Sequence, residues 1–267
     1  MKLRVIKKYL IIGLKIMRRD LILNFTYRAQ FWGDTLGSII WSLVYLAFIK
    51  IIFNYTDLLA NWSYWQILLI FCFQQLNFYF IYIFIMPSLR EFHDQIRKGN
   101  FDFIINKPLD SQFFSSVQKF TFSVSLCFVI MLIFLGYILQ QLNWQFNWLQ
   151  IIITLYLFCC SVIIVYACLN LIACLSFWFI RAEALTQVWF ETYNISEYPR
   201  QIYHGWLKFI FCYILPFLLF FNLPAEAIQG IYHWPELLFI SIFTLAITIF
   251  NRWFWNLSIK HYSSASS

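Results

Sequence analysis

The chain has 267 residues, of which 62% are hydrophobic, 22% are aromatic and only 12% are charged. A soluble domain carries roughly 25% charged residues, so this composition indicates a protein that is embedded in a membrane. We assign the net charge of +7 to attraction by anionic lipid head groups rather than by nucleic acid, because there is no soluble domain on which a basic patch could lie.

Residues 1–30 are too charged to cross a membrane, but they have the pattern of an amphipathic helix. Its apolar face comprises Leu3, Ile6, Leu10, Leu14, Met17 and Leu21, and its basic face comprises Arg4, Lys8, Lys15 and Arg19. These spacings of three and four residues put each set on one side of a helix. We expect this helix to lie flat on the cytoplasmic surface of the membrane, with its cations at the lipid heads.

Residues 31–260 contain six apolar runs, each near or above the roughly 20 residues that a helix needs to cross the hydrocarbon core. The predicted spans are 32–53, 65–86, 120–139, 149–180, 204–222 and 237–256. Pro216 lies inside the fifth span and should kink it, because proline removes a backbone hydrogen bond. The sequence therefore predicts an all-α integral membrane protein with six transmembrane helices.

The distribution of Lys and Arg predicts the orientation of these spans. If both termini are cytoplasmic, every Lys and Arg except Lys50 falls on the cytoplasmic side, including Arg200 and Lys208. Loops that are rich in Lys and Arg stay on that face of a membrane. We therefore expect a multi-pass protein whose residues 261–267 form a cytoplasmic tail.

The cytoplasmic segment 88–119 has an unusual composition. Residues 88–98 are polar and compatible with a helix, which Gly99 should end, because glycine tolerates the left-handed conformation at a helix C-terminus. Several apolar side chains follow in a stretch that is not a span, namely Phe101, Phe103, Ile104 and Ile105. Such a set should dock either on the chain's own helices or on a partner protein.

Residues 182–199 predict a second helix on the cytoplasmic surface. Its apolar face contains Leu185, Val188, Trp189, Thr192 and Ile195, and its polar face contains Glu183, Gln187, Glu191 and Asn194. A two-sided pattern of this kind is typical of a helix at an interface. Pro199 should end it, because the residue before a proline is disfavoured in the helical region.

The sequence lacks the motifs of several enzyme classes. It has no G-x-x-x-x-G-K-[ST] phosphate loop and no H-E-x-x-H zinc motif, and its seven cysteines are scattered through apolar runs. We therefore expect no catalytic residue, no metal and no cofactor bound by this chain.

Few polar residues lie within the predicted spans, and none is an Asp or Glu at depth, since Glu226 and Glu236 flank the last outer loop. This pattern argues against a proton-driven carrier, which usually places an ionisable group inside the membrane. The polar residues Gln75, Asn77 and Asn170 either hydrogen-bond between helices or line a translocation path.

Three stretches of the sequence carry a family resemblance. They are Lys98-Gly99-Asn100-Phe101-Asp102-Phe103 followed by Lys107-Pro108-Leu109, the expected turn Leu223-Pro224-Ala225-Glu226-Ala227-Ile228 with Gly230, and the tail Tyr262-Ser263-Ser264-Ala265-Ser266-Ser267. Together with the N-terminal helix and the six spans, they resemble the permease subunits of ABC-2 type transporters, in particular a small six-span bacterial group. The resemblance covers essentially the whole chain.

The resemblance implies an export permease of the bacterial cytoplasmic (inner) membrane, without an ATPase motif of its own. Two permease subunits, identical or related, would form the path, and a separate ATP-binding-cassette ATPase subunit would bind ATP and Mg and dock on their cytoplasmic face. Within 88–119, the residues expected to couple to that ATPase are Arg90, Glu91, Arg97, Lys98, Phe101, Asp102, Lys107 and Pro108.

Two other functions stay open on the sequence alone. An integral-membrane lipid-modifying enzyme would need a titratable pair or a metal cluster, for which Glu91, His93 and Asp94 are the candidates. A passive channel or scramblase would need no ATPase partner.

Overall fold

The computed structural model describes residues 2–26, 28–179 and 182–262, and the regular elements in these ranges are helices. Arg181 and the tail residues 263–267 lie outside them. Within these ranges, four helices are long and apolar enough to cross a membrane: α2 (Arg28–Ile52), α3 (Tyr64–Phe84), α8 (Trp148–Cys174, extended by the 3-10 turn η1, Leu175–Phe177) and α12 (Trp234–Lys260). A fifth, α7 (Ser125–Gln141), is apolar but shorter. The prediction of an all-α membrane protein is confirmed at this level.

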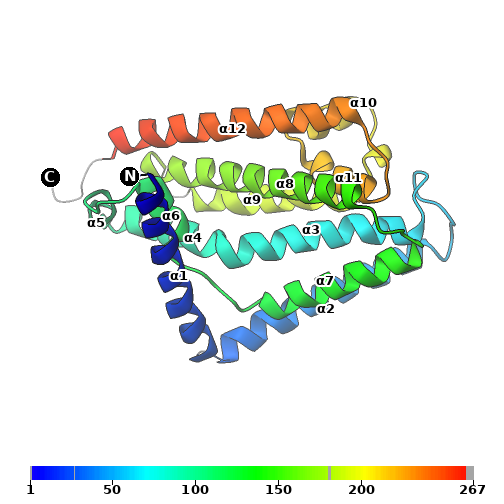
Figure 1. The fold of residues 1–267 in the computed structure, drawn as a ribbon, viewed down its shortest axis with the longest axis horizontal. Coiled ribbons are helices and arrows are strands. Elements are labelled where there is room, and N and C mark those ends of the chain that lie inside the picture. The colour runs from blue at the N-terminus through cyan, green and yellow to red at the C-terminus, as the bar shows by residue number, and fades with distance from the viewer. Residues whose placement is uncertain (1, 27, 180–181, 263–267) are drawn as a thin grey trace.

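The long helices lie side by side and give the bundle two distinct ends (Figure 1). The connections 53–63, 142–147 and 229–233 lie at one end, which we call the loop end. At the other, which we call the terminal end, α1 (Lys2–Thr26) crosses the bundle at a steep angle to α2 (Figure 1). The C-terminal part of α12 also reaches the terminal end, because Tyr9 of α1 and Arg252 of α12 both contact Asp110.

Three short helices follow α3 at the terminal end, namely α4 (Met86–Arg97), α5 (Asp102–Ile105) and α6 (Ser111–Val117). Gly99 closes α4 with a φ of +69°, as the sequence predicted. The N–H groups of Gly99 and Asn100 donate to the carbonyls of Ile96 and Gln95, which satisfies the open end of the helix. The chain thereby turns sharply into α5.

The segment 182–203 runs the length of the bundle, from α9 (Glu183–Tyr193) through η2 (Asn194–Glu197) and η3 (Arg200–Ile202). It starts beside α4, where Thr186 lines a cavity together with Arg90. The hydroxyl of Tyr193 donates to Asn77 in the middle of α3, and Trp62 of the loop end donates to Gln201. The prediction of a helix lying flat on the cytoplasmic surface over residues 182–199 was therefore wrong.

The reason is an ambiguity in the amphipathic pattern of α9. Trp189 and Tyr193 are buried against the bundle, whereas Leu185 and Val188 are 45% and 63% exposed. A helix on the outside of a membrane bundle packs one apolar face on protein and turns another toward lipid. Its residue pattern resembles that of a helix lying flat at a water interface, so periodicity does not separate the two.

Residues 205–228 form two helical pieces in place of the predicted span 204–222. The first is α10 (Gly205–Phe209) with the π-helical turn η4 (Ile210–Ile214), and the second is α11 (Phe217–Ile228). They meet at Pro216 with a bend of 79°, so the proline interrupts the helix as predicted, but far more sharply than a kink. The expected turn at 223–228 is the end of α11, which is buried at every residue.

Arg200 lies at the loop end in a buried ionic cluster. Its Nη2 is 3.1 Å from Oε2 of Glu226, and its Nη1 contacts Glu236 at the start of α12. Arg200 is 6% exposed and Glu226 is 2% exposed, so neither flanks a solvated loop. Arg200, and the exposed Lys208 in the adjoining α10, thus lie at the opposite end of the bundle from α1 and the α4–α6 region, so the prediction that groups them with those cations was wrong. For Arg200 the reason is that a count of cations cannot recognise one that buried carboxylates neutralise.

Candidate functional site

The segment between α4 and α6 is anchored in the protein by a buried part around Phe101, which we call the base. This side chain is fully buried, with ring centroids 5.4 Å from Phe92 of α4 and 5.4 Å from Phe177 at the end of α8. Trp255 of α12 and Tyr262 complete the aromatic cluster, at 6.3 Å and 5.3 Å from Phe101. The cluster fixes α5 to three other elements of the bundle.

The opposite side of α5 and the loop after it point away from the protein. We call this group the tip, which consists of Phe103, Ile105, Asn106, Lys107 and Pro108, all of them exposed. Phe103 is the most exposed of its apolar members at 73%. Of the apolar set, Phe101 and Ile104 dock on the chain's own helices, which is one of the two alternatives that the sequence left open, whereas Phe103 and Ile105 are exposed.

Three of the cations predicted for coupling lie on α4 or directly after it. Arg97 and Lys98 are exposed at its C-terminal end, and Arg97 pairs with Asp94 at 2.6 Å. Arg90 is exposed as well, with its guanidinium over the ring of Tyr82 at 5.6 Å. Together with Lys107 of the tip, these three exposed cations make the α4–α5 region basic.

Other predicted coupling residues are held by contacts within the chain or are partly buried. Glu91 pairs with Lys119 at 3.5 Å, and Asp102 is half-buried at the start of α5. The ammonium of Lys107 lies 3.7 Å from the centroid of the Phe114 ring, and partial burial lowers the pKa of Lys107. The ring of Phe114 thereby holds this cation of the tip in place.

Asp110 connects α6 to α12. Its Oδ1 accepts from the N–H of Phe113 at 2.9 Å, which caps the start of α6, and Arg252 donates to both of its oxygens at 2.5 and 3.1 Å. Partial burial acts to raise the pKa of Asp110, but the hydrogen bonds from Arg252 and Phe113 outweigh it and hold the pKa below its ordinary value.

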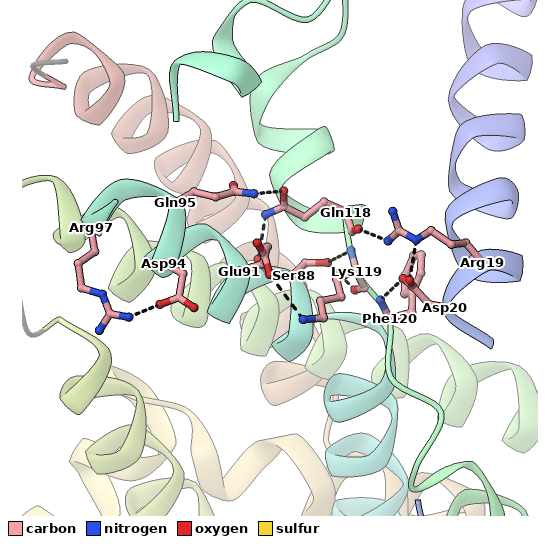
Figure 2. Close-up of polar contacts among 10 residues, drawn as sticks. All are labelled: Arg19, Asp20, Ser88, Glu91, Asp94, Gln95, Arg97, Gln118, Lys119 and Phe120. Atoms are coloured by element: carbon pink, nitrogen blue, oxygen red, sulfur yellow. Dashed lines mark hydrogen bonds and ion pairs between the residues drawn. The ribbon is translucent and has the colours of Figure 1, made fainter. Parts of the chain in front are cut away.

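Side chains of α4 hold the non-helical stretch that leads toward α7 (Figure 2). The hydroxyl of Ser88 donates to the carbonyl of Lys119 at 2.7 Å and accepts from the N–H of the same residue at 3.1 Å. Gln118 donates to the carbonyl of Ser88 at 3.2 Å and accepts from Gln95 at 3.0 Å. These reciprocal contacts leave α4 and residues 118–120 little freedom to move apart.

The N-terminal helix α1 holds the same stretch from the other side (Figure 2). The carboxylate of Asp20, only 3% exposed, accepts from the N–H of Phe120 at 2.9 Å and from Arg19 at 2.8 Å. Arg19 also donates to the carbonyl of Gln118 at 3.0 Å. Sequence reasoning missed Asp20, although it is the one acidic residue in the otherwise basic stretch 1–30.

The predicted path residues Gln75, Asn77 and Asn170 lie inside the chain's own core, at 3%, 0% and 0% exposure. Asn77 donates to Ser161 at 2.9 Å, and Asn170 donates to Asn251 at 2.7 Å. Both asparagines therefore join long helices to one another, which is the structural role that the sequence left open beside a role in a path.

The candidates for an enzymatic centre do not converge. Glu91 pairs with Lys119, His93 contacts Ser176, and Asp94 pairs with Arg97. In the described part of the chain, no group of three or more His, Cys, Asp and Glu residues could hold a metal ion. The site therefore connects an exposed tip to the long helices through packed aromatic rings and the hydrogen bonds between Asp110 and Arg252.

A comparison with protein families identifies the chain. A family model described as ABC-2 family transporter protein matches residues 39–266, from within α2 to the C-terminal tail. No curated protein and no solved structure matches the chain. The chain therefore belongs to the ABC-2 family of transporter proteins and is a membrane permease of the ABC-2 type.

Proposed function

We propose that this chain is the membrane-spanning subunit of an ATP-binding-cassette exporter, which works as a dimer and is driven by a separate ATPase subunit. Permeases of the ABC-2 family normally pair with such a subunit. One observation carries the proposal: the segment around α5 combines an exposed apolar and basic tip with a base that is buried among the long helices.

A force on the tip would reach the long helices through two contacts. The first is the aromatic cluster around Phe101, which is close-packed and so transmits displacement rather than absorbing it. The second is the pair of hydrogen bonds between Asp110 and Arg252 of α12. Closure of a soluble partner could therefore rock α12 and α8 as rigid bodies.

The predicted coupling residues divide into two roles in this proposal. Those that would contact the ATPase subunit are Arg90, Glu91, Arg97, Lys98, Asp102, Lys107 and Pro108, and we add the tip residue Phe103 because it is exposed. Phe101 is fully buried, so its role would be to position α5 rather than to touch the partner. A matching partner surface would have an apolar pocket with acidic residues around it.

The proposed membrane topology has six crossings, formed by α2, α3, α7, α8, the segment 182–203 and α12. The bent pair 205–228 would enter the membrane from the loop end and return to it. The terminal end would be cytoplasmic, because α1 and the α4–α6 region carry most of the Lys and Arg. In this orientation α1 would lie at the inner leaflet, with its basic side chains among the lipid head groups.

The proposed path lies between two permease subunits rather than inside one. Gln75, Asn77 and Asn170 are buried in the packed core of a single chain, which supports a path between subunits over one through a chain. The second subunit would be an identical or a related chain. The direction, outward across a bacterial cytoplasmic membrane, follows from the family resemblance.

The substitution Phe103→Asp tests the proposal. The tagged chain and its ATPase subunit would be isolated together in mild detergent, and ATP hydrolysis would be measured per permease. Since Phe103 is 73% exposed, a charge there should leave the fold intact but place a carboxylate in the proposed contact. We expect the associated ATPase activity to fall at least about tenfold, which corresponds to a loss of 1.4 kcal/mol in binding.

The matched control is Tyr55→Asp, since Tyr55 is an exposed aromatic residue at the loop end, 88% accessible. It should retain full ATPase association. Equal ATPase activities in the two variants would show that the tip is not part of the coupling surface. Uphill transport by the chain alone in liposomes would overturn the need for an ATPase subunit.

A further inference from the structure

A cavity of about 420 Å³ lies between α2 and the segment 191–203. Binding sites for small molecules have volumes of about 300–1,000 Å³, so this cavity has room for a compact ligand. Its aromatic lining consists of Trp41, Tyr45, Phe48, Tyr198 and Tyr203. Trp41 and Phe48 are 60% and 49% exposed on the outer face of α2, so the cavity is accessible from outside the chain.

Two carboxylates, Glu191 and Glu197, share this aromatic lining, and no Lys or Arg is among the described residues that form it. Glu197 is only 5% exposed, and its Oε1 has no hydrogen-bond partner. Two of the lining tyrosine hydroxyls are already committed, because Tyr45 donates to the backbone carbonyl of Glu197 and Tyr203 donates to that of Ile195, both at 3.2 Å. The carboxylate therefore lines the cavity without a donor or a cation.

A cavity lined by aromatic rings and carboxylates favours a cationic ligand. A buried carboxylate that lacks a partner is costly, and a cation placed beside it would remove the cost. Aromatic rings attract cations through the negative charge of their faces, and they also accept an apolar body. Glu191 is exposed, so its carboxylate adds attraction for an approaching cation.

We propose that this cavity binds an organic cation with an apolar body, and that Glu197 is the residue that recognises its charge. An anionic or strongly hydrated ligand would leave the buried carboxylate unsatisfied. That the bound cation is the transported cargo rests on the function proposed above. The binding itself does not, because it needs only this chain and no ATP.

Binding can be measured with the full chain in lipid nanodiscs, using radiolabelled tetraphenylphosphonium as the probe and empty nanodiscs as the background. Tetraphenylborate has the same shape and the opposite charge, so it separates recognition of charge from partition into lipid. The variants are Glu197→Gln and Glu191→Gln, with Asp57→Asn as the control that removes an exposed carboxylate at the loop end. Melting temperatures and size-exclusion profiles would show whether each variant is folded.

We expect saturable binding of the phosphonium that Glu197→Gln weakens by at least about tenfold, because one charge–charge contact in a partly dry site is lost. Glu191→Gln should weaken it less, and Asp57→Asn should leave it unchanged. Glu197→Gln should melt no lower than the wild type, since it removes an unpaired buried carboxylate. Equal affinity of Glu197→Gln and Asp57→Asn, or binding of the borate as tightly as the phosphonium, would overturn the proposal. If Glu197→Gln failed to fold, binding of the borate by the wild type as tightly as the phosphonium would still overturn the proposal.

Discussion

Replacing Arg200 by Met should destabilise the protein more than the loss of any single solvated cation. The substitution keeps an unbranched apolar stem but leaves the buried carboxylate of Glu226 with its cation removed and with Glu236 nearby. Breaking a buried ion pair by removing one partner costs about 3–5 kcal/mol. At about 2–4 °C per kcal/mol for a chain of this size class, the melting temperature should fall by roughly 6–20 °C.

The cause of that loss can be isolated with a second variant. Glu226→Gln leaves Arg200 paired with Glu236, so it should cost only about 1.5–3 kcal/mol, the range for a hydrogen bond to a charged group. Combining it with Arg200→Met removes both buried charges. The double variant should therefore be more stable than Arg200→Met alone, a strongly non-additive result.

Thermal unfolding in detergent, followed by circular dichroism and size exclusion, would measure these differences. Lys208→Met is the matched control, because Lys208 is an exposed cation on the adjoining α10 and its loss should change stability by no more than about 0.5 kcal/mol. If Arg200→Met melted within a degree or two of Lys208→Met, Arg200 would be solvated, and the ionic cluster at the loop end would be refuted.

Two further predictions concern the α5 and α6 region. Phe101→Ala empties a fully buried aromatic site and should lower the free energy of unfolding by about 3–5 kcal/mol. Phe103→Ala, on the exposed side of α5, should be nearly neutral. Similar melting temperatures for the two variants would contradict the division into base and tip. Since the pKa of Asp110 is held below its ordinary value, its contact with Arg252 stabilises the fold above the ordinary carboxyl range and is lost as the pH falls through the lowered pKa. The melting temperature of the wild type should therefore exceed that of Asp110→Asn near neutral pH and converge with it in acid, and a constant difference across the titration would show that the carboxylate is not responsible.

Much of the functional region could be predicted from local sequence. Gly99 ends α4 because a left-handed residue is needed there, and some of the apolar residues after it dock on the bundle. Sequence could not divide them into a buried base and an exposed tip, because the partners of Phe101 come from α8 and α12, more than seventy residues further along the chain. The contacts of Asp20 to residues 118–120 are equally remote in sequence.

The sequence alone determined what depends on composition and on neighbouring residues: a helical membrane protein, its long apolar helices, the interruption at Pro216 and the end of α4. The tertiary structure decided what depends on distant pairing. It carried residues 182–203 along the bundle, bent 205–228 by 79° at Pro216 and buried Arg200 between two carboxylates. The physical reason is that apolar residues look alike whether they face lipid or protein, and a charge looks the same whether water or a buried counter-ion neutralises it, so only contacts between remote segments separate these cases.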